Sequence, residues 1–509
     1  MISLIVSPTP SEYAVPSPAR RLRRRALAWL NDMLFDSPVY FLFLIPVVLL
    51  YWRLNHRAQN VFLLLASYFF YGWWDWRFLA LMIGSTTVDF LIAQRIAISR
   101  SDPNRKQWFI FSLLLNFAIL GVFKYFDFFA GSFVGALDKL GIHNIPLPLI
   151  RIILPPGISF YTFQEVAYIV DVYKGRIEAS RSFFEYGLFI SLFPHLIAGP
   201  IQRPSHLLPQ VQRDRTFDAD RFFDGLMLIF SGLIRKCVVA DNCALLANAV
   251  FGGQFGPSNF WLVLLGTYAF TWQVYGDFSG YSDIARGSAQ LLGFHFMVNF
   301  RQPFLANRLQ DFWRRWHISL STWLRDYLYI PLGGSAHGNW KTCRNLFITM
   351  VLAGLWHGAN WTFVIFGAIH RVVLAAERYF FPAKSKSGGA DLLQRPTGFF
   401  SLWAQRILTF NILCLSLAFF RATSLRAAVQ LLAGLSNFAW RSEYASAFFM
   451  LCLFSIPLFV VDLLLEASNH EYPFATSPYA VRTALAAAAF LVLALFSGSN
   501  LNAFVYFQF

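Results

Sequence analysis

Residues 353–361 read Ala353-Gly354-Leu355-Trp356-His357-Gly358-Ala359-Asn360-Trp361, and they set an imidazole in the middle of an apolar run. Lys341 and Arg344 stand before this run and Arg371 follows it, so its apolar length suits a helix that crosses a membrane. A titratable side chain is costly at membrane depth and by default marks a transport path or a reaction site. His357 is therefore the first candidate for chemistry carried out within a bilayer.

The composition is that of a polytopic membrane protein. Of the 509 residues, 57% are hydrophobic and 14% are charged, whereas soluble proteins carry about 25% charged residues. Apolar runs recur from Val39 almost to the C-terminus, and their lengths predict about 11–13 membrane-spanning helices. The runs are continuous and do not alternate, which favours helices over the strands of a membrane barrel. The predicted fold class is an all-α polytopic membrane protein.

The net charge of +15 would suggest a nucleic-acid partner in a soluble protein. Here the basic residues gather in short loops between apolar runs, which is typical of cytosolic loops that face anionic lipid. We therefore expect membrane lipid as a partner, and no nucleic acid. The five cysteines form no Cys-x-x-Cys pair, so the sequence indicates neither a metal site nor a disulfide framework.

Residues 1–32 differ from the rest of the chain. They end in a basic cluster made of Arg20, Arg21, Arg23, Arg24 and Arg25. Basic residues after the first and third apolar runs assign those loops to the cytosol, so the arginine cluster opposes the orientation of the first span. We expect residues 1–32 to be a disordered extension, with Met33 as a natural alternative start. Residues 33–509 would then form a single transmembrane domain.

Two apolar runs are interrupted in ways that indicate an internal cavity. Pro155-Pro156-Gly157 breaks one run, and Arg235-Lys236 lies inside another. Broken helices at membrane depth are tolerated only when they are buried in protein or line a wet cavity. No internal repeat is visible, which weighs against transporters that are built from inverted repeats.

A second candidate histidine lies in the strongly amphipathic stretch 311–329. Aromatic and aliphatic residues recur there every three or four positions, which predicts one continuous helix lying in the membrane interface. His317 sits beside the apolar face of this helix. Periodicity alone supports two interpretations equally. In one the histidine is functional, and in the other the helix is an interfacial anchor in which the histidine has no function.

His357 has neighbours that favour a reaction site. Gly354 and Gly358 allow backbone or ligand to approach closely, and Asn360 would place an amide on the same helical face. A neutral imidazole at this place is able to take a proton from a hydroxyl or thiol. The alternative is a structural histidine that bonds across helices.

Four carboxylates lie in or between apolar runs. Asp277 and Asp283 belong to a polar, glycine-containing stretch between the predicted spans 260–275 and 281–297. They are suited to orienting a histidine, pairing with an arginine or capping a helix, and capping is the expected role of Asp283. We expect Glu165 and Asp171 to pair with a buried basic residue.

Several motifs together resemble the membrane-bound O-acyltransferase (MBOAT) family, in particular its bacterial alginate O-acetyltransferase-like branch. The first set is Trp316-His317-Ile318-Ser319-Leu320, Trp323-Leu324-Arg325-Asp326-Tyr327 and Gly354-Leu355-Trp356-His357-Gly358. The second set is Gly157-Ile158-Ser159-Phe160, Ala198-Gly199-Pro200-Ile201 and residues 277–285. The resemblance covers the chain from about Met33 onward. It also extends to the D-alanyl transferase of teichoic acids.

The resemblance implies a ring of tilted helices around a thin centre, with interfacial and re-entrant helices and a tunnel that joins cytosol and periplasm. It implies a bacterial inner-membrane enzyme that needs no cofactor and no metal. Acetyl-CoA would be the donor substrate. The acceptor would be an exported, alginate-like polysaccharide or a periplasmic acetyl-accepting protein.

The family's two histidines correspond to His317 and His357, so both are expected to be catalytic, with His357 as general base. The supporting residues would be Asn360, Asp277 and Trp316. The donor phosphates would meet Arg314, Arg315 and Arg325, for which contact with lipid headgroups is the equally weighted alternative. Two other functions stay open: D-alanyl or other acyl transfer from a carrier protein, and a channel that feeds acyl groups to a separate transferase.

Overall fold

The computed structural model describes residues 33–98, 103–143, 153–197, 199–336, 338–380, 398–468, 470–472 and 476–497. Within these ranges the chain is helical and has no β-strand. The predicted all-α fold is confirmed. The extension predicted at residues 1–32 lies outside the described residues.

The N-terminal helices are α2 (Pro38–Tyr51), α3 (His56–Gly72), α4 (Trp76–Ile98), α5 (Arg105–Leu120), α6 (Phe126–Lys139), α7 (Ile158–Tyr173), α8 (Phe183–Ser191), α9 (Phe193–Leu196) and α10 (Pro204–Gln212). The central helices are α11 (Ala219–Leu233), α12 (Asp241–Phe251), α13 (Phe260–Leu291), α14 (Leu309–Arg315) and α15 (Ile318–Leu324). The C-terminal helices are α16 (Gly338–His357), α17 (Trp361–Phe380), α18 (Phe399–Arg421), α19 (Leu425–Ala433), α20 (Glu443–Ser468) and α21 (Tyr479–Phe496). Short segments are the π-helical turns η2 (Gly121–Tyr125), η3 (Ile234–Ala240) and η5 (Arg325–Tyr329), and the 3₁₀ turns η4 (Pro303–Leu305) and η6 (Gly434–Ser436).

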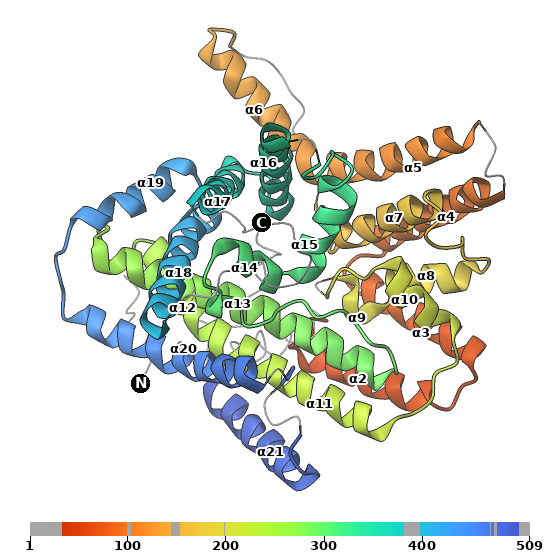
Figure 1. The fold of residues 1–509 in the computed structure, drawn as a ribbon. Coiled ribbons are helices and arrows are strands. Elements are labelled where there is room, and N and C mark those ends of the chain that lie inside the picture. The colour runs from red at the N-terminus through yellow and green to blue at the C-terminus, as the bar shows by residue number, and fades with distance from the viewer. Residues whose placement is uncertain are drawn as a thin grey trace, which may run out of the picture.

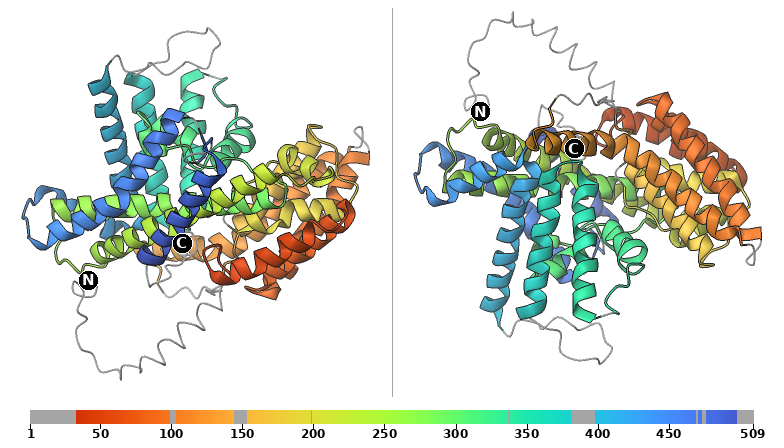
Figure 2. Two further views of the ribbon diagram at one scale, coloured as in Figure 1. Left: turned by 90° about the horizontal axis from the view of Figure 1, so that it is seen from below. Right: turned by 90° about the horizontal axis from the view of Figure 1, so that it is seen from above.

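The long helix α13 is the central element of the fold (Figure 1). α11, η3 and α12 lie along α13. The N-terminal helices gather on one side of α11 and α13. α16, α17 and α18 stand side by side and cross the direction of α13 (Figure 2). α6 projects away from the other helices (Figure 1). The two candidate histidines, His317 and His357, lie where α16 approaches α13.

Glycine allows α13 to approach its neighbour closely. A Cβ atom added to Gly280 on α13 would lie 2.6 Å from the carbonyl oxygen of Gly232 on α11. The reverse substitution at Gly232 would place a Cβ 2.5 Å from the carbonyl oxygen of Gly280. Small residues at such crossings let helix backbones pack together within a membrane.

Five of the described helical segments are long and apolar enough to cross a membrane. They are Trp76–Ile98, Arg105–Lys139, Phe399–Arg421, Glu443–Ser468 and Tyr479–Phe496. Some of the other apolar runs form shorter helices, such as the 14-residue α2, or helices interrupted by π turns. Arg235 and Lys236 lie in one of these turns, η3, so the predicted irregularity at this place is a π turn inside a continuing helix.

Two predictions about helix boundaries are wrong. The spans predicted at 260–275 and 281–297 form one helix, α13, of 32 residues. Asp283 therefore lies inside a helix and does not cap one. The run predicted as one span around His357 forms two helices, because α16 ends at His357 and α17 begins at Trp361. A Cβ on Gly354 would lie 3.2 Å from the backbone nitrogen of Gly367, so α16 and α17 pack directly against each other.

Candidate active site

His317 lies at a sharp break between α14 and α15. Its backbone φ is 43°, in the left-handed region, which a residue other than glycine adopts only when its surroundings hold it there. The Asn299 carbonyl oxygen accepts from the Ile318 backbone nitrogen at 2.9 Å. The Asn299 side chain accepts from the Ser319 hydroxyl at 2.9 Å. The prediction of one continuous interfacial helix at 311–329 is wrong, since the chain turns at His317.

The His317 side chain is completely buried among aromatic rings. Its exposed fraction is 0%. Its ring centroid lies 4.5 Å from that of Phe278 and 5.5 Å from that of Trp356. Neither ring nitrogen has a hydrogen-bond partner among the described residues. Since a buried polar group without a partner is costly, this imidazole is available to a ligand.

His357 is the last residue of α16 and is 5% exposed. Its ring lies 5.2 Å from Phe420 and 6.3 Å from Phe366, measured between centroids. It also lines a small apolar cavity of about 20 Å³. His357 therefore borders an enclosed and largely dry space at the end of its helix.

Trp356 brings the two histidines together. Its ring centroid lies 5.0 Å from that of His357 and 5.5 Å from that of His317. The two imidazoles come from separate helices and are 40 positions apart in the chain (357 − 317). The fold thus joins both sequence candidates in one buried cluster, which we call the histidine cluster: His317, Trp356 and His357.

A third histidine nearby, His370 on α17, has a structural environment. Its Nδ1 accepts from the Trp313 indole at 3.2 Å, and its Nε2 lies 2.9 Å from the Ser416 hydroxyl. Because Nδ1 accepts, Nε2 carries the proton and donates to Ser416. His370 is therefore fully satisfied, in contrast to His317.

The expected supporting residues take different places. Asp277 forms an ion pair with the Lys236 ammonium, at 2.9 Å. Asn360 accepts from the Thr362 backbone nitrogen at 3.0 Å and so caps α17. Trp316 is buried and packs on Phe300, at 5.0 Å between centroids. Trp316 thus helps to wall the cluster, while Asn360 fixes the start of the next helix.

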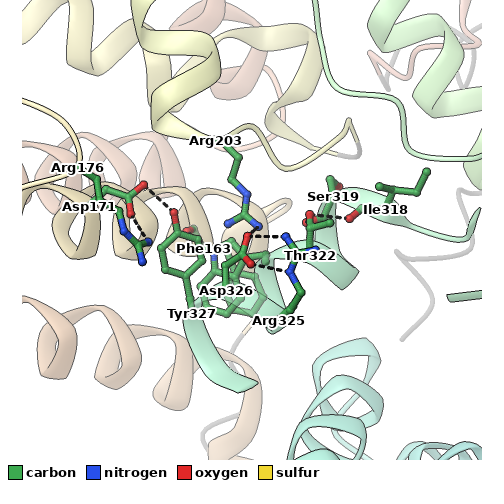
Figure 3. Close-up of polar contacts among 11 residues, drawn as sticks. Phe163, Asp171, Arg176, Arg203, Ile318, Ser319, Thr322, Arg325, Asp326 and Tyr327 are labelled. Carbon is green, nitrogen blue, oxygen red and sulfur yellow. Dashed lines mark hydrogen bonds and ion pairs between the residues drawn. The ribbon is translucent and has the colours of Figure 1, made fainter. Parts of the chain in front are cut away.

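The three candidate donor-binding arginines are not equivalent. Arg325 donates to Asp326 at 2.7 Å, and Arg203 donates to the same carboxylate at 3.0 Å (Figure 3). The hydrogen bond to Asp326 raises the pKa of Arg325. Arg315 forms ion pairs with Asp311 and, at 2.7 Å, with Glu466. Arg314 is exposed and forms no ion pair within the described part of the chain.

The carboxylates in the N-terminal helices also differ from each other. Asp171 pairs with Arg176 at 3.0 Å and accepts from the Tyr327 hydroxyl at 2.7 Å (Figure 3). Arg176 is substantially exposed, so its pairing with Asp171 lies at a surface. Glu165 accepts from the hydroxyls of Ser85 and Thr86 and forms no ion pair with a described residue. The prediction of a buried basic partner is wrong for Glu165, because neighbouring hydroxyls supply its hydrogen bonds.

A polar space of about 150 Å³ lies at Arg235, one of the two places where the sequence predicts a cavity. It is lined by Arg235, Arg286, Arg301, Asp283 and Glu471, among others. Arg235 pairs there with Asp283 at 3.5 Å. Asp283 thus takes the arginine-pairing role in place of the predicted cap.

Lys124 is a charged neighbour that the sequence did not single out. It lies in the π turn η2, and its Nζ donates to the carbonyl oxygen of Trp356 and to the Ser159 hydroxyl, the latter at 3.3 Å. The available signal was a lone lysine in the otherwise apolar run Gly121-Val122-Phe123-Lys124-Tyr125.

Comparison with known proteins shows the family to which this chain belongs. The sequence model of the membrane-bound O-acyltransferase family matches residues 176–420, which include both histidines. The chain is 40% identical to the probable alginate O-acetylase AlgI of Pseudomonas syringae pv. tomato, over 80% of this chain and 76% of that protein. The chain belongs to the membrane-bound O-acyltransferase family. It is therefore a membrane-embedded acyltransferase.

Other MBOAT relatives act on different acceptors, according to their names. The chain is 32% identical to the peptidoglycan O-acetyltransferase of Helicobacter pylori, over 94% of this chain and 98% of that protein. It is 29% identical to the teichoic acid D-alanyltransferase of Bacillus subtilis, over 47% of this chain and 62% of that protein. The names of these relatives describe acyl transfer that involves alginate, peptidoglycan or teichoic acid.

Proposed function

We propose that this MBOAT protein is a bacterial inner-membrane O-acetyltransferase. It takes acetyl from cytosolic acetyl-CoA. It passes the group across the membrane to an exported, alginate-like polysaccharide or to a periplasmic acetyl-accepting protein. The names of the relatives support acetyl as the group transferred and a polysaccharide as the final acceptor.

The observation that carries this proposal is the meeting of His317 and His357 at Trp356, in a buried cluster with an enclosed cavity. Burial excludes water, so a thioester held there is protected from hydrolysis. With two imidazoles in one cluster, one is able to bind the acetyl donor while the other moves a proton.

In the proposed reaction His357 takes the proton of the acceptor hydroxyl. The acceptor oxygen then attacks the acetyl carbonyl carbon, and the C–S bond to the CoA sulfur breaks. The proton passes from His357 to the leaving thiolate, which yields an O-acetyl ester and free CoA thiol. His317 orients the donor or stabilises the oxyanion of the tetrahedral intermediate, and the enclosed site supplies proximity.

The donor phosphates would meet the basic residues Arg314, Arg315 and Arg325. Arg314 is the best placed of the three because it is exposed and outside the ion pairs that engage the other two. A guanidinium that already binds a carboxylate must first exchange that partner for a phosphate.

Transfer of radiolabelled acetyl from acetyl-CoA in membranes tests the proposal, with wild type, His357→Ala and His317→Ala compared at matched expression. Label that reaches a polysaccharide or partner protein in wild type alone supports it. Equal label in all three would mean that the histidines are structural.

The likeness to the teichoic acid D-alanyltransferase favours a second candidate, acyl transfer from a carrier protein. In that case acetyl-CoA neither binds nor competes, while an acylated carrier protein supplies label. A non-enzymatic acyl channel is the remaining alternative, and transfer by the purified protein to a model acceptor excludes it.

A further inference from the structure

Lys124 is a cation in an apolar helical segment, and it has no anionic partner within the described part of the chain. It lies midway along Arg105–Lys139, one of the five apolar segments. It forms no ion pair with any residue that the structure describes. Its ammonium lies 5.5 Å from the centroid of the Trp356 ring. A charge placed at such a site by default marks function.

The π turn η2 aims two side chains at the end of α16. Lys124 donates to the carbonyl oxygen of Trp356, and the Tyr125 hydroxyl donates to that of Leu355 at 3.2 Å. The last carbonyl groups of a helix have no partner within the helix, and a cation there also interacts favourably with the helix dipole. The chain after His357 turns at once into α17, so these two bonds fix the helix end that carries the imidazole.

Lys124 also places a positive charge beside His357. Of the groups that face His357, His317 on the α14–α15 break and His370 on α17 are themselves imidazoles. Lys124 on η2 is the charged one. Burial is the main reason that a charged imidazole is disfavoured at His357, and an ammonium held at the neighbouring Trp356 disfavours it further, so both favour the neutral, proton-accepting form.

We propose that Lys124 is a positioning residue of the transfer site, which holds the end of α16 and adds to burial in favouring the neutral, proton-accepting form of His357. This inference rests on the proposed function, since it assigns His357 the role of base. It adds a residue that lies outside the family match at 176–420.

The test compares four variants of the full-length protein in membranes: Lys124→Met, Lys124→Arg, Tyr125→Phe and Lys139→Met. Lys124→Met removes both the bond and the charge, and Lys124→Arg keeps the charge. Tyr125→Phe removes the neighbouring bond to α16 without changing charge. Lys139→Met removes an exposed lysine from the end of the same long helical segment and is the matched control.

We expect Lys124→Met to lower kcat by up to about a hundredfold with little change in the KM for acetyl-CoA, because the base is misplaced while donor binding is kept. The acid side of its pH–rate profile should move to higher pH by about one unit, since the imidazole protonates more readily without the cation. Lys124→Arg should restore the wild-type profile. Tyr125→Phe should lower kcat modestly with an unshifted profile, and Lys139→Met should change neither.

Wild-type kcat and profile in Lys124→Met would overturn the proposal, and so would a loss of activity with an unshifted profile that arginine does not rescue. A measurement independent of transfer keeps this outcome separate from failure of the proposed function. Ring ¹⁵N chemical shifts of His357, assigned by comparison with His357→Gln, report its protonation against pH. A profile that is the same in wild type and Lys124→Met overturns the electrostatic role even if acetyl is the wrong group.

Discussion

Two buried polar regions lie close together in this protein and are built in opposite ways. In the first, the ion-pair network of η3, the Arg235 guanidinium lies 3.4 Å from Asp462 and donates to Tyr275 at 3.0 Å. Lys236 pairs with Asp241 at 2.8 Å and with Asp277 at 2.9 Å. In the second, the histidine cluster, His317 makes no hydrogen bond to a described residue, and the adjoining Lys124 has no carboxylate among its partners.

This difference distinguishes buried polar groups that stabilise the fold from those that are candidates for the reaction. Buried charges that are fully paired hold helices together, and removing one partner leaves the other uncompensated. Buried groups that are left without partners destabilise the fold, so they persist where a substrate completes them. We therefore expect the ion-pair network to stabilise the fold, and His317 in the histidine cluster to meet a ligand.

The carboxylates of the ion-pair network also come near the arrangement of a metal site. Ligand atoms of Asp36, Cys237 and Asp241 lie within 4.8 Å of one another. The Lys236 ammonium already contacts Asp241 at 2.8 Å, so this lysine supplies the positive charge that the cluster requires.

The sharpest test of the comparison is His357→Ala. If the histidine cluster performs the chemistry, acetyl transfer falls by about a hundredfold to ten-thousandfold, which is the range for loss of a general base. Folding stays intact, because the side chain is a small part of the core. Labelled acetyl transfer is measured together with the melting temperature in detergent. Normal transfer by a well-folded variant would contradict the mechanism.

The opposite pattern is expected for Lys236→Met in the ion-pair network. Loss of the ammonium leaves Asp241 and Asp277 buried without their partner, which destabilises the protein by about 3–5 kcal/mol. The melting temperature should fall, and residual activity per folded molecule should stay near wild type. Asp277→Asn in the same chain should recover part of the loss. An unchanged melting temperature would mean that the network is not what holds η3 against α13.

His317→Gln is expected to have a smaller effect on transfer than loss of His357. If His317 stabilises the oxyanion, kcat falls by about a hundredfold to a thousandfold, as for loss of one oxyanion donor. Stability should not fall, because both imidazole nitrogens lack partners within the described structure. A fall in melting temperature as large as that of Lys236→Met would place His317 with the structural groups instead.

The smallest effects are expected for the candidate donor-binding arginines, Arg314 and Arg325. Arg325→Gln loses an exposed pair with Asp326 and should change stability by about 0–1 kcal/mol. Arg314→Gln should raise the KM for acetyl-CoA by about tenfold if it meets a donor phosphate, because charge-assisted bonds contribute about 1.5–3 kcal/mol. Kinetics at matched salt compare the two variants. Equal KM values for both would assign these arginines to lipid.

Periodicity predicted most helices, and it failed where a helix ends inside an apolar run. The stretch 311–329 keeps helical spacing through Trp316 and His317, yet His317 adopts a left-handed backbone. That turn is held by bonds to Asn299, which lies outside the stretch. Similarly, the polar residues around Asp277 suggested a break in α13, but ion pairs to another helix satisfy them in place.

Sequence reasoning found both histidines and missed their surroundings. The cost of a titratable group at membrane depth marked His357. The amphipathic stretch 311–329 left the role of His317 open, and the family resemblance favoured a catalytic one. Lys124 was visible in the sequence as a lone lysine in an apolar run, but its contact with Trp356 joins residues 232 positions apart. The sequence has no local signal for such a contact.

Composition and residue order are thus sufficient to establish a helical membrane acyltransferase, since hydropathy acts over short stretches and the family motifs are local. The pairing of the two histidines, the charge beside them and the assignment of Asp277 to Lys236 emerge only in the folded chain. The physical reason is that hydrogen bonds and ion pairs depend on distances of a few ångströms. Those distances are set by how α7, α13 and α16 pack and not by their separation in sequence.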